Sequence, residues 1–260
     1  NIFAGADGVI GQGVGAVNIN GTWIGSLTAV SQDDGYWVKV SAATTLSLTD
    51  AEPVNYDADG EVVYAIAYGN NLISYPFENG QSLAGGLGSS AGSVYAIAGE
   101  GVAALVINGE FVGSLTAFEG GNGYWMVATD DFSFSFTGVA DGLTREQQPV
   151  LRAVPEAYSY RQSDQQAFFF VESATIQGVE LNTDDIIIAY NGDVIVGSRY
   201  WNGELTDIPA IGVDSKGGEM YAGYCEAGDI ISFKVLDSAT GELVPMHVEG
   251  EVTWTNMAML

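Results

Sequence analysis

Several residue types are scarce in this 260-residue sequence, and each scarcity narrows the chemistry that the chain can perform. The one cysteine, Cys225, excludes an intrachain disulfide and a cysteine-based zinc centre, and we expect it to be a small buried apolar residue. The one histidine, His247, lies in a strand-like segment at 242–248, and we expect a structural role for it. No apolar run reaches the roughly 18 residues of a membrane-spanning helix, so membrane insertion is not expected.

Basic residues are scarce as well. Seven Lys and Arg stand against 33 Asp and Glu, for a formal net charge of −26. Such a chain cannot neutralise a nucleic acid backbone or release its counterions, so nucleic acid is excluded as an expected partner. Self-repulsion destabilises the compact state at low ionic strength, whereas marine salt shortens the Debye length to a few Å and screens it. We therefore expect a salty or divalent-rich medium.

Apolar residues are abundant, at 47% of the chain, but 35 glycines divide them into short runs typical of β-hairpins. An offset of 88 residues aligns residues 11–38 with 99–126 without a gap, at 15 identities in 28 positions. This indicates an internal repeat. In both copies an Asn-Gly pair, Asn20-Gly21 or Asn108-Gly109, lies between alternating apolar residues, which predicts a two-residue type I′ hairpin.

The second copy is preceded by a strand-like segment at 68–77 that has no counterpart in the first copy. We expect either that an upstream part has been removed or that a strand from elsewhere completes the first copy, since an unpaired sheet edge favours strand addition. Further strand-like runs follow residue 157, with Asn191-Gly192 as a third predicted hairpin turn. We predict an all-β fold of tandem small antiparallel β-sandwich-like modules, two of them an internal repeat. The predicted boundaries are 1–50 for the incomplete first repeat, 51–139 for the second, 140–156 for a linker, and 157–260 for a C-terminal β-sandwich module.

Two longer motifs resemble known proteins. The pattern DDIIIAYNGDVIVGSRYWNG at 184–203, followed by AGDIISFKVLDSATGEL at 227–243, resembles a module of surface proteins of marine Bacteroidetes-type bacteria and of structural proteins of marine phages. The repeat is similar to units that precede this module in the same proteins. The resemblance implies a β-sandwich surface protein and carries no catalytic residue.

Two segments are candidate binding sites. Asn55, Asp57 and Asp59 alternate before Gly60, as at the start of a calcium-binding EF-hand loop, but Ile66 replaces the glutamate that such a loop needs. We therefore predict at most a β-loop calcium site, with ligands Asp57, Asp59 and Glu61, and a solvated acidic turn is the alternative.

The second segment is the cluster Arg199, Tyr200, Trp201 and Asn202, which follows a predicted strand. Arg199 offers a positive charge and Trp201 a stacking face, so we predict a contact with a partner or a glycan. Trp37 and Trp125 recur at one repeat position, which we interpret as packing in a core or between modules.

The sequence thus predicts a non-enzymatic structural protein of a virion, such as a fibre, tail or capsid-surface component of a marine phage. Its expected partners are other copies of itself, neighbouring virion or surface proteins, or a cell-surface glycan, and its expected location is the virion surface or the extracellular medium. One alternative is a segment of a bacterial cell-surface adhesin or filament that binds glycans. Another is an accessory module of a secreted polysaccharide-degrading enzyme.

Overall fold

The computed structural model describes residues 5–46, 62–136, 147–214 and 218–260. These residues form several antiparallel sheets and one short α-helix, which confirms the predicted all-β class. The chain divides into two compact units. Unit 1 comprises Asn1–Gly99, Asn108–Glu110 and Thr116–Gln148, and unit 2 comprises Glu100–Ile107, Phe111–Leu115 and Pro149–Leu260.

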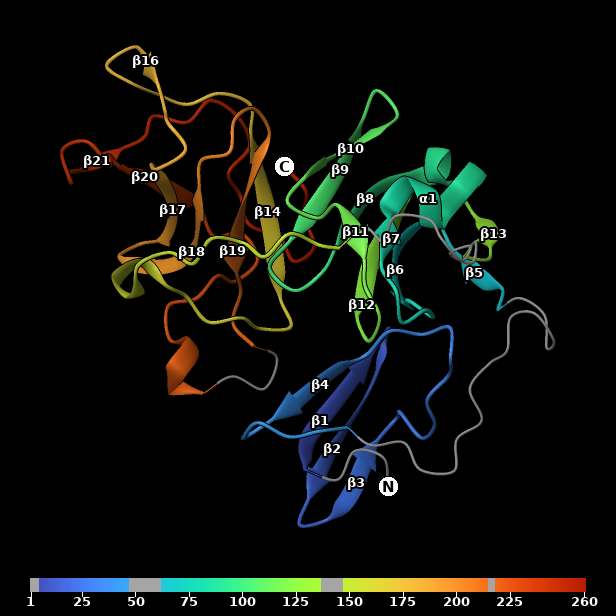
Figure 1. The fold of residues 1–260 in the computed structure, drawn as a ribbon. Helices are drawn as coiled ribbons and strands as arrows, with labels where there is room; N and C mark the ends of the chain where they lie inside the picture. The colour runs from blue at the N-terminus through green and yellow to red at the C-terminus, as the bar shows by residue number, and fades with distance from the viewer. Residues whose placement is uncertain (1–4, 47–61, 137–146, 215–217) are drawn as a thin grey trace. The chain divides into compact units, whose positions relative to one another are not determined.

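The first sheet of unit 1 has the strand order β3-β2-β1-β4 (Figure 1). Its strands are β1 (Ala6–Gly11), β2 (Val14–Ile19), β3 (Thr22–Gly25) and β4 (Trp37–Val40). The turn between β2 and β3 places Asn20 at φ 51° and Gly21 at φ 86°. Positive φ at both central residues is what a type I′ turn requires, so the Asn-Gly pair sets this hairpin.

A second sheet, which is not confined to unit 1, has the strand order β10-β9-β8-β12-β6. Its strands are β6 (Gly69–Ser74), β8 (Val94–Ala98), β9 (Ala103–Ile107), β10 (Glu110–Gly113) and β12 (Gly123–Ala128). Two short pairs accompany it: β5 (Tyr64–Ile66) with β13 (Phe132–Phe134), and β7 (Gln81–Ser82) with β11 (Ala117–Phe118). The helix α1 (Leu83–Leu87) begins after Ser82, whose hydroxyl accepts a hydrogen bond from the backbone N–H of Gly85.

The two sheets have matching registers at the offset of 88 residues. Strand β4 pairs with β1 through Trp37↔Ile10 and Val38↔Val9, and β12 pairs with β8 through Trp125↔Ala98 and Met126↔Ile97. Both pairings also contain a register shift at equivalent residues. In the first sheet Ala6 and Gly8 pair with Val40 and Lys39, and in the second sheet Val94 and Ala96 pair with Ala128 and Val127. The difference is at the outer side, where β12 pairs with β6 and β4 has no equivalent strand among the described residues.

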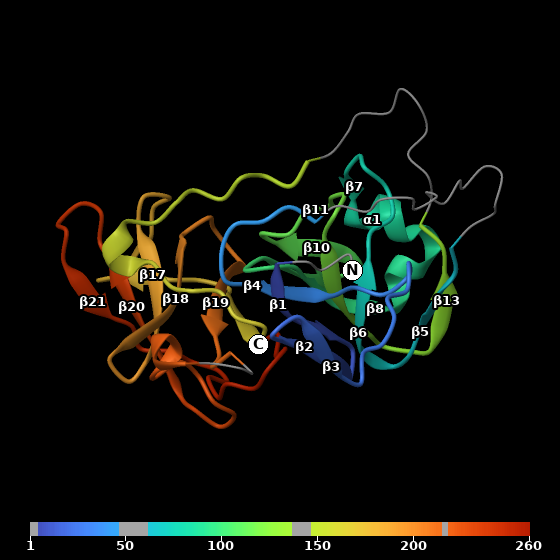
Figure 2. The same ribbon diagram turned by 90° about the horizontal axis from the view of Figure 1, so that it is seen from below.

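Unit 2 contains a sheet of order β18-β17-β20-β21 (Figure 2) and a separate β14-β19 pair (Figure 1). The strands are β14 (Gln166–Val171), β17 (Ile186–Asn191), β18 (Val194–Tyr200), β19 (Thr206–Ile211), β20 (Ile231–Leu236) and β21 (Leu243–Pro245), and a further short pair joins β15 (Thr175–Ile176) to β16 (Val179–Glu180). The C-terminal segment runs beside β14, where Phe168 donates to the carbonyl of Ala258 and Phe170 to that of Leu260. The strands enclose an apolar core that includes Phe169, Ile208 and Trp254, and a smaller cluster contains Ile186, Ile188 and Tyr190.

Candidate functional site

A buried ion pair lies in unit 2, between the ends of β18 and β19. Arg199 is 8% exposed and Asp207 is 2% exposed. The guanidinium Nη2 of Arg199 lies 3.0 Å from Oδ2 of Asp207, and its Nε donates to the backbone carbonyl of Asp207 at 2.8 Å. A buried charge is tolerated only when it is paired and hydrogen-bonded, and both conditions are met here.

Residues that flank the β9–β10 hairpin contribute the other partners of this ion pair. Ser114 donates to Asp207 from its backbone N–H at 2.8 Å and from its hydroxyl at 2.7 Å. Burial raises the pKa of the Asp207 carboxyl above its ordinary value, while Arg199 and the two Ser114 donors act in the opposite direction by favouring the ionised form. We call Arg199, Asp207, Ser114 and the groups bound to them the buried polar network.

The turn between β8 and β9, Glu100-Gly101, is held by the same network. The carbonyl of Gly101 accepts from Nη2 of Arg199 at 2.7 Å, and its N–H donates to the side-chain oxygen of the fully buried Gln166 at 3.3 Å. Gly101 has φ 66°, and a Cβ there would collide with the side-chain amide of Gln162. The positive φ favours glycine here, and any larger residue would also require the Gln162 side chain to shift.

In unit 1 the equivalent turn of the first repeat copy, Gln12-Gly13, also contacts a neighbouring element. The side-chain amide of Gln12 donates to the carbonyl of Asn70 at 3.0 Å and accepts from the N–H of Leu72 at 2.9 Å. Beside it the N–H of Gly35 donates to the carbonyl of Leu72 at 3.1 Å. These contacts satisfy backbone groups on the outer edge of β6 that would otherwise face solvent. We call Gln12-Gly13 and Glu100-Gly101 the docking turns.

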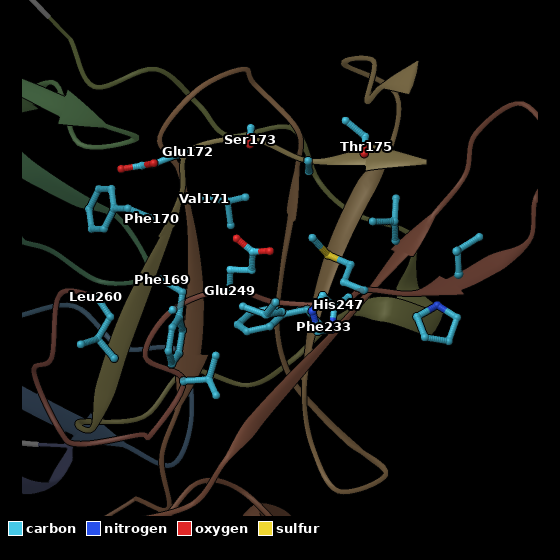
Figure 3. Close-up of a pocket in the computed structure, with 18 of the residues that line it drawn as sticks. Phe169, Phe170, Val171, Glu172, Ser173, Thr175, Phe233, His247, Glu249 and Leu260 are labelled. Atoms are coloured by element: carbon cyan, nitrogen blue, oxygen red, sulfur yellow. The ribbon is translucent and has the colours of Figure 1, made fainter. Parts of the chain in front are cut away.

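A pocket of about 760 Å³ lies on another side of unit 2 (Figure 3). Its lining residues are 169–176, Phe233, Val235, 244–252 and Leu260. The buried rings of Phe169 and Phe233 contribute apolar surface, and the exposed side chains of His247, Glu172 and Glu249 contribute polar groups. The predicted structural histidine is therefore an exposed residue of a pocket wall, because β21 ends at Pro245 and the chain after it follows the surface.

The carboxylates give this pocket an acidic character. The Glu251 carboxylate accepts hydrogen bonds from the side chain and the backbone N–H of Thr253. These bonds lower the pKa of the Glu251 carboxyl below its ordinary value. None of the lining residues is a lysine or arginine. Hydroxyl or amine donors are therefore the ligand groups that fit this pocket.

The structure separates the members of the predicted contact cluster at 199–202. Arg199 bonds inside the protein and Trp201 is 7% exposed, so neither side chain presents the charge or the stacking face that the sequence suggested. Both faces of β18 are buried from Val196 to Arg199, so Arg199 lies inside the protein. Tyr200 is half-buried beneath the guanidinium of Arg152, 3.8 Å from the ring centroid, and Asn202 is exposed. For these two a partner contact stays a prediction.

The predicted calcium ligands Asp57, Asp59 and Glu61 lie outside the described residues. Within the residues that the structure describes, no three Asp, Glu, His or Cys side chains form a group that could hold a metal ion. Cys225 is 1% exposed, as expected, and burial raises the pKa of its thiol to about 12.

Sequence reasoning missed the partners of Arg199. Ser114 belongs to the repeated GSLTA motif, and in both copies this serine accepts a local bond, from Gly15 to Ser26 and from Ala103 to Ser114. Only Ser114 also bonds to Asp207, at a separation of 93 residues. One feature of the sequence pointed to a buried ion pair at Arg199. Arginine is scarce in this chain, so an arginine within a predicted strand is a candidate for such a pair.

Within the described ranges no helix is long and apolar enough to cross a membrane. Comparison with family models, with curated proteins and with solved structures finds no match to this chain.

Proposed function

We propose that this chain is a non-enzymatic structural protein that works through assembly and surface contact. The observation that carries the proposal is the pair of docking turns. In each repeat copy the turn after the first strand is fixed by hydrogen bonds to an element far away in the sequence, through Gln12 in unit 1 and through Gly101 in unit 2. Repeated contacts of this kind hold small β-modules in order along a chain, as stacked structural proteins require.

The use of charge supports the same proposal. Arg199 is one of only seven Lys and Arg residues, and its guanidinium binds Gly101 and Asp207 inside the protein. Replacing a buried ion pair with apolar residues is often neutral for stability, so we assign this pair a role in specifying one arrangement of the chain. The virion surface of a marine phage is our preferred setting, and it rests on the sequence resemblance alone.

The test is the mass of the purified chain in solution, measured by multi-angle light scattering at low salt and at seawater-like salt. Because a net charge of −26 opposes association, we expect oligomers of defined size at high salt and dissociation at low salt. A calcium chelator added at high salt tests whether the acidic segment at 55–61 contributes. A monomer under all conditions would refute assembly of the chain with itself.

A second candidate function, a glycan-binding adhesin segment, is favoured by the acidic pocket of unit 2. Its volume of about 760 Å³ lies within the range of small-ligand sites. Calorimetric titration with neutral oligosaccharides would test it, with Glu249→Gln as the pocket variant and Glu180→Gln as a matched control on the exposed strand β16. Binding lost only in Glu249→Gln would support the adhesin, and no binding to the parent chain would reject it.

A further inference from the structure

Within the described residues, the outer edge of β4 is one of the places where the two repeat copies differ in pairing. In the second sheet that position is occupied by β6, which pairs antiparallel with β12 through Trp125↔Leu72, Met126↔Asn71 and Ala128↔Gly69. In the first sheet β4 is a terminal strand, and no described strand lies beyond it. Since β4 and β12 share their register with the preceding strand, including its irregularity, their outer edges are equivalent.

Side chains on the two strands also differ in exposure. Val38 and Val40 of β4 are 40% and 41% exposed. Their equivalents in β12, Met126 and Ala128, are 0% and 3% exposed. Apolar β-branched residues favour pairing with a further strand, and the strand also carries Lys39, a charge of the kind with which natural proteins limit non-specific pairing at such edges.

The backbone pattern of β6 defines what fits this edge. Asn70 and Leu72 direct their backbone groups to the side chain of Gln12. Because backbone groups alternate between the two sides of a strand, those of Asn71 and Ile73 face β12. Met126 pairs with Asn71, and Val38 is the equivalent of Met126 in the first copy. The backbone N–H and C=O of Val38 therefore point away from β1, toward the outer edge.

We propose that the outer edge of β4 binds a β6-like strand of another polypeptide, in antiparallel orientation and in the register that β6 has on β12. The occupant is an extended segment with the pattern of residues 68–75, in which Asn71 and Ile73 supply the backbone groups that pair. Strand addition of this kind gives affinity through main-chain hydrogen bonds and specificity through alternate side chains. This inference rests on the proposed assembly function and names the partner and the surface.

Cross-linking in register tests the proposal. The full chain with Val38→Cys is mixed with a synthetic peptide of residues 68–75 that carries Asn71→Cys, under thiol–disulfide exchange. Directly opposed residues of an antiparallel pair are close enough for a disulfide. We expect the mixed disulfide to form at least about tenfold faster than with the control chain Ile24→Cys, because binding raises the effective concentration of the peptide thiol. Ile24 is a suitable control because it lies on β3, the opposite edge of the same sheet, and is 55% exposed.

Two further arms keep the result specific. An Ile73→Pro peptide lacks the N–H that faces β12 and is expected to lose the rate advantage. Hydrogen exchange of β4 is expected to slow when the unmodified peptide is added. Equal rates at Val38→Cys and Ile24→Cys, or rapid Val38→Cys homodimers without peptide, would overturn the proposal, the latter in favour of pairing between two β4 edges. Light scattering of the unmodified chain is an independent readout, so assembly through another surface and failure of strand addition remain distinguishable.

Discussion

The buried polar network makes a quantitative prediction for the stability of unit 2. Replacing Arg199 with Met removes its three bonds to Gly101 and Asp207 and leaves a buried carboxylate without its cation. Removing one partner of a buried ion pair costs about 3–5 kcal/mol. Asp207→Leu leaves the guanidinium uncompensated, so we expect a loss of similar size from it.

The double variant Arg199→Met/Asp207→Leu distinguishes a network from independent contacts. It leaves no uncompensated charge, so we expect it to be more stable than the sum of the single losses by at least about 1 kcal/mol. Urea unfolding followed by hydrogen exchange of fragments from β17 and β19 reports on unit 2 alone. The matched control is Asp184→Asn, which breaks an ion pair with Arg152 whose side chains are 56% and 66% exposed, at an expected cost below about 1 kcal/mol. Single losses as small as the control, or strict additivity, would refute the reasoning.

Three further predictions concern single residues. Burial raises the pKa of Asp185, but hydrogen bonds from Ser238 and Asn182 outweigh it and hold that pKa below its ordinary value. The ionised carboxylate therefore stabilises the fold above about pH 4, and this contribution is lost as pH falls further. The free energy of unfolding should depend less on pH in Asp185→Asn than in the parent chain when it is measured across an acid titration. Gly113→Ala should lower the thermal stability more than Gly109→Ala does, because a Cβ at Gly113 collides with the carbonyl of Ala103. A Cβ at Gly109 points into open space, so only the positive φ of that residue costs stability, by about 1 kcal/mol. The thiol of Cys225 should resist an aromatic disulfide reagent in the folded chain and react after unfolding, and rapid reaction of native protein would contradict its burial.

Local signals in the sequence predicted much of the fold. The pairs Asn20-Gly21 and Asn108-Gly109 form hairpin turns with positive φ at both residues, as predicted. The third pair is shifted by one residue. Asn191 is the last residue of β17 and pairs with Val194, and its side chain donates to Asp229 at 2.7 Å. A tertiary hydrogen bond therefore overrides the local turn preference of this asparagine.

Other elements could not be predicted from local pattern. Strand β19 contains Pro209, which argues against a central strand. Among the described strands β19 pairs only with β14, so it tolerates the missing N–H. The helix α1 is five residues long and contains two glycines, so its sequence has no helical periodicity from which it could be predicted. The partners of Arg199 are 8 and 98 residues away, and a single sequence carries no signal for such a contact.

Native-state hydrogen exchange of the two docking turns tests the central claim most directly. The N–H of Gly101 donates to Gln166 and the N–H of Leu72 donates to Gln12, whereas Gly109 lies at an open hairpin tip. We predict that fragments containing Gly101 and Leu72 exchange as slowly as the strands beside them, and that Gly109 exchanges fast. Exchange at Gly101 and Leu72 as fast as at Gly109 would mean that the turns are not docked and would contradict the account of a chain built from fixed modules.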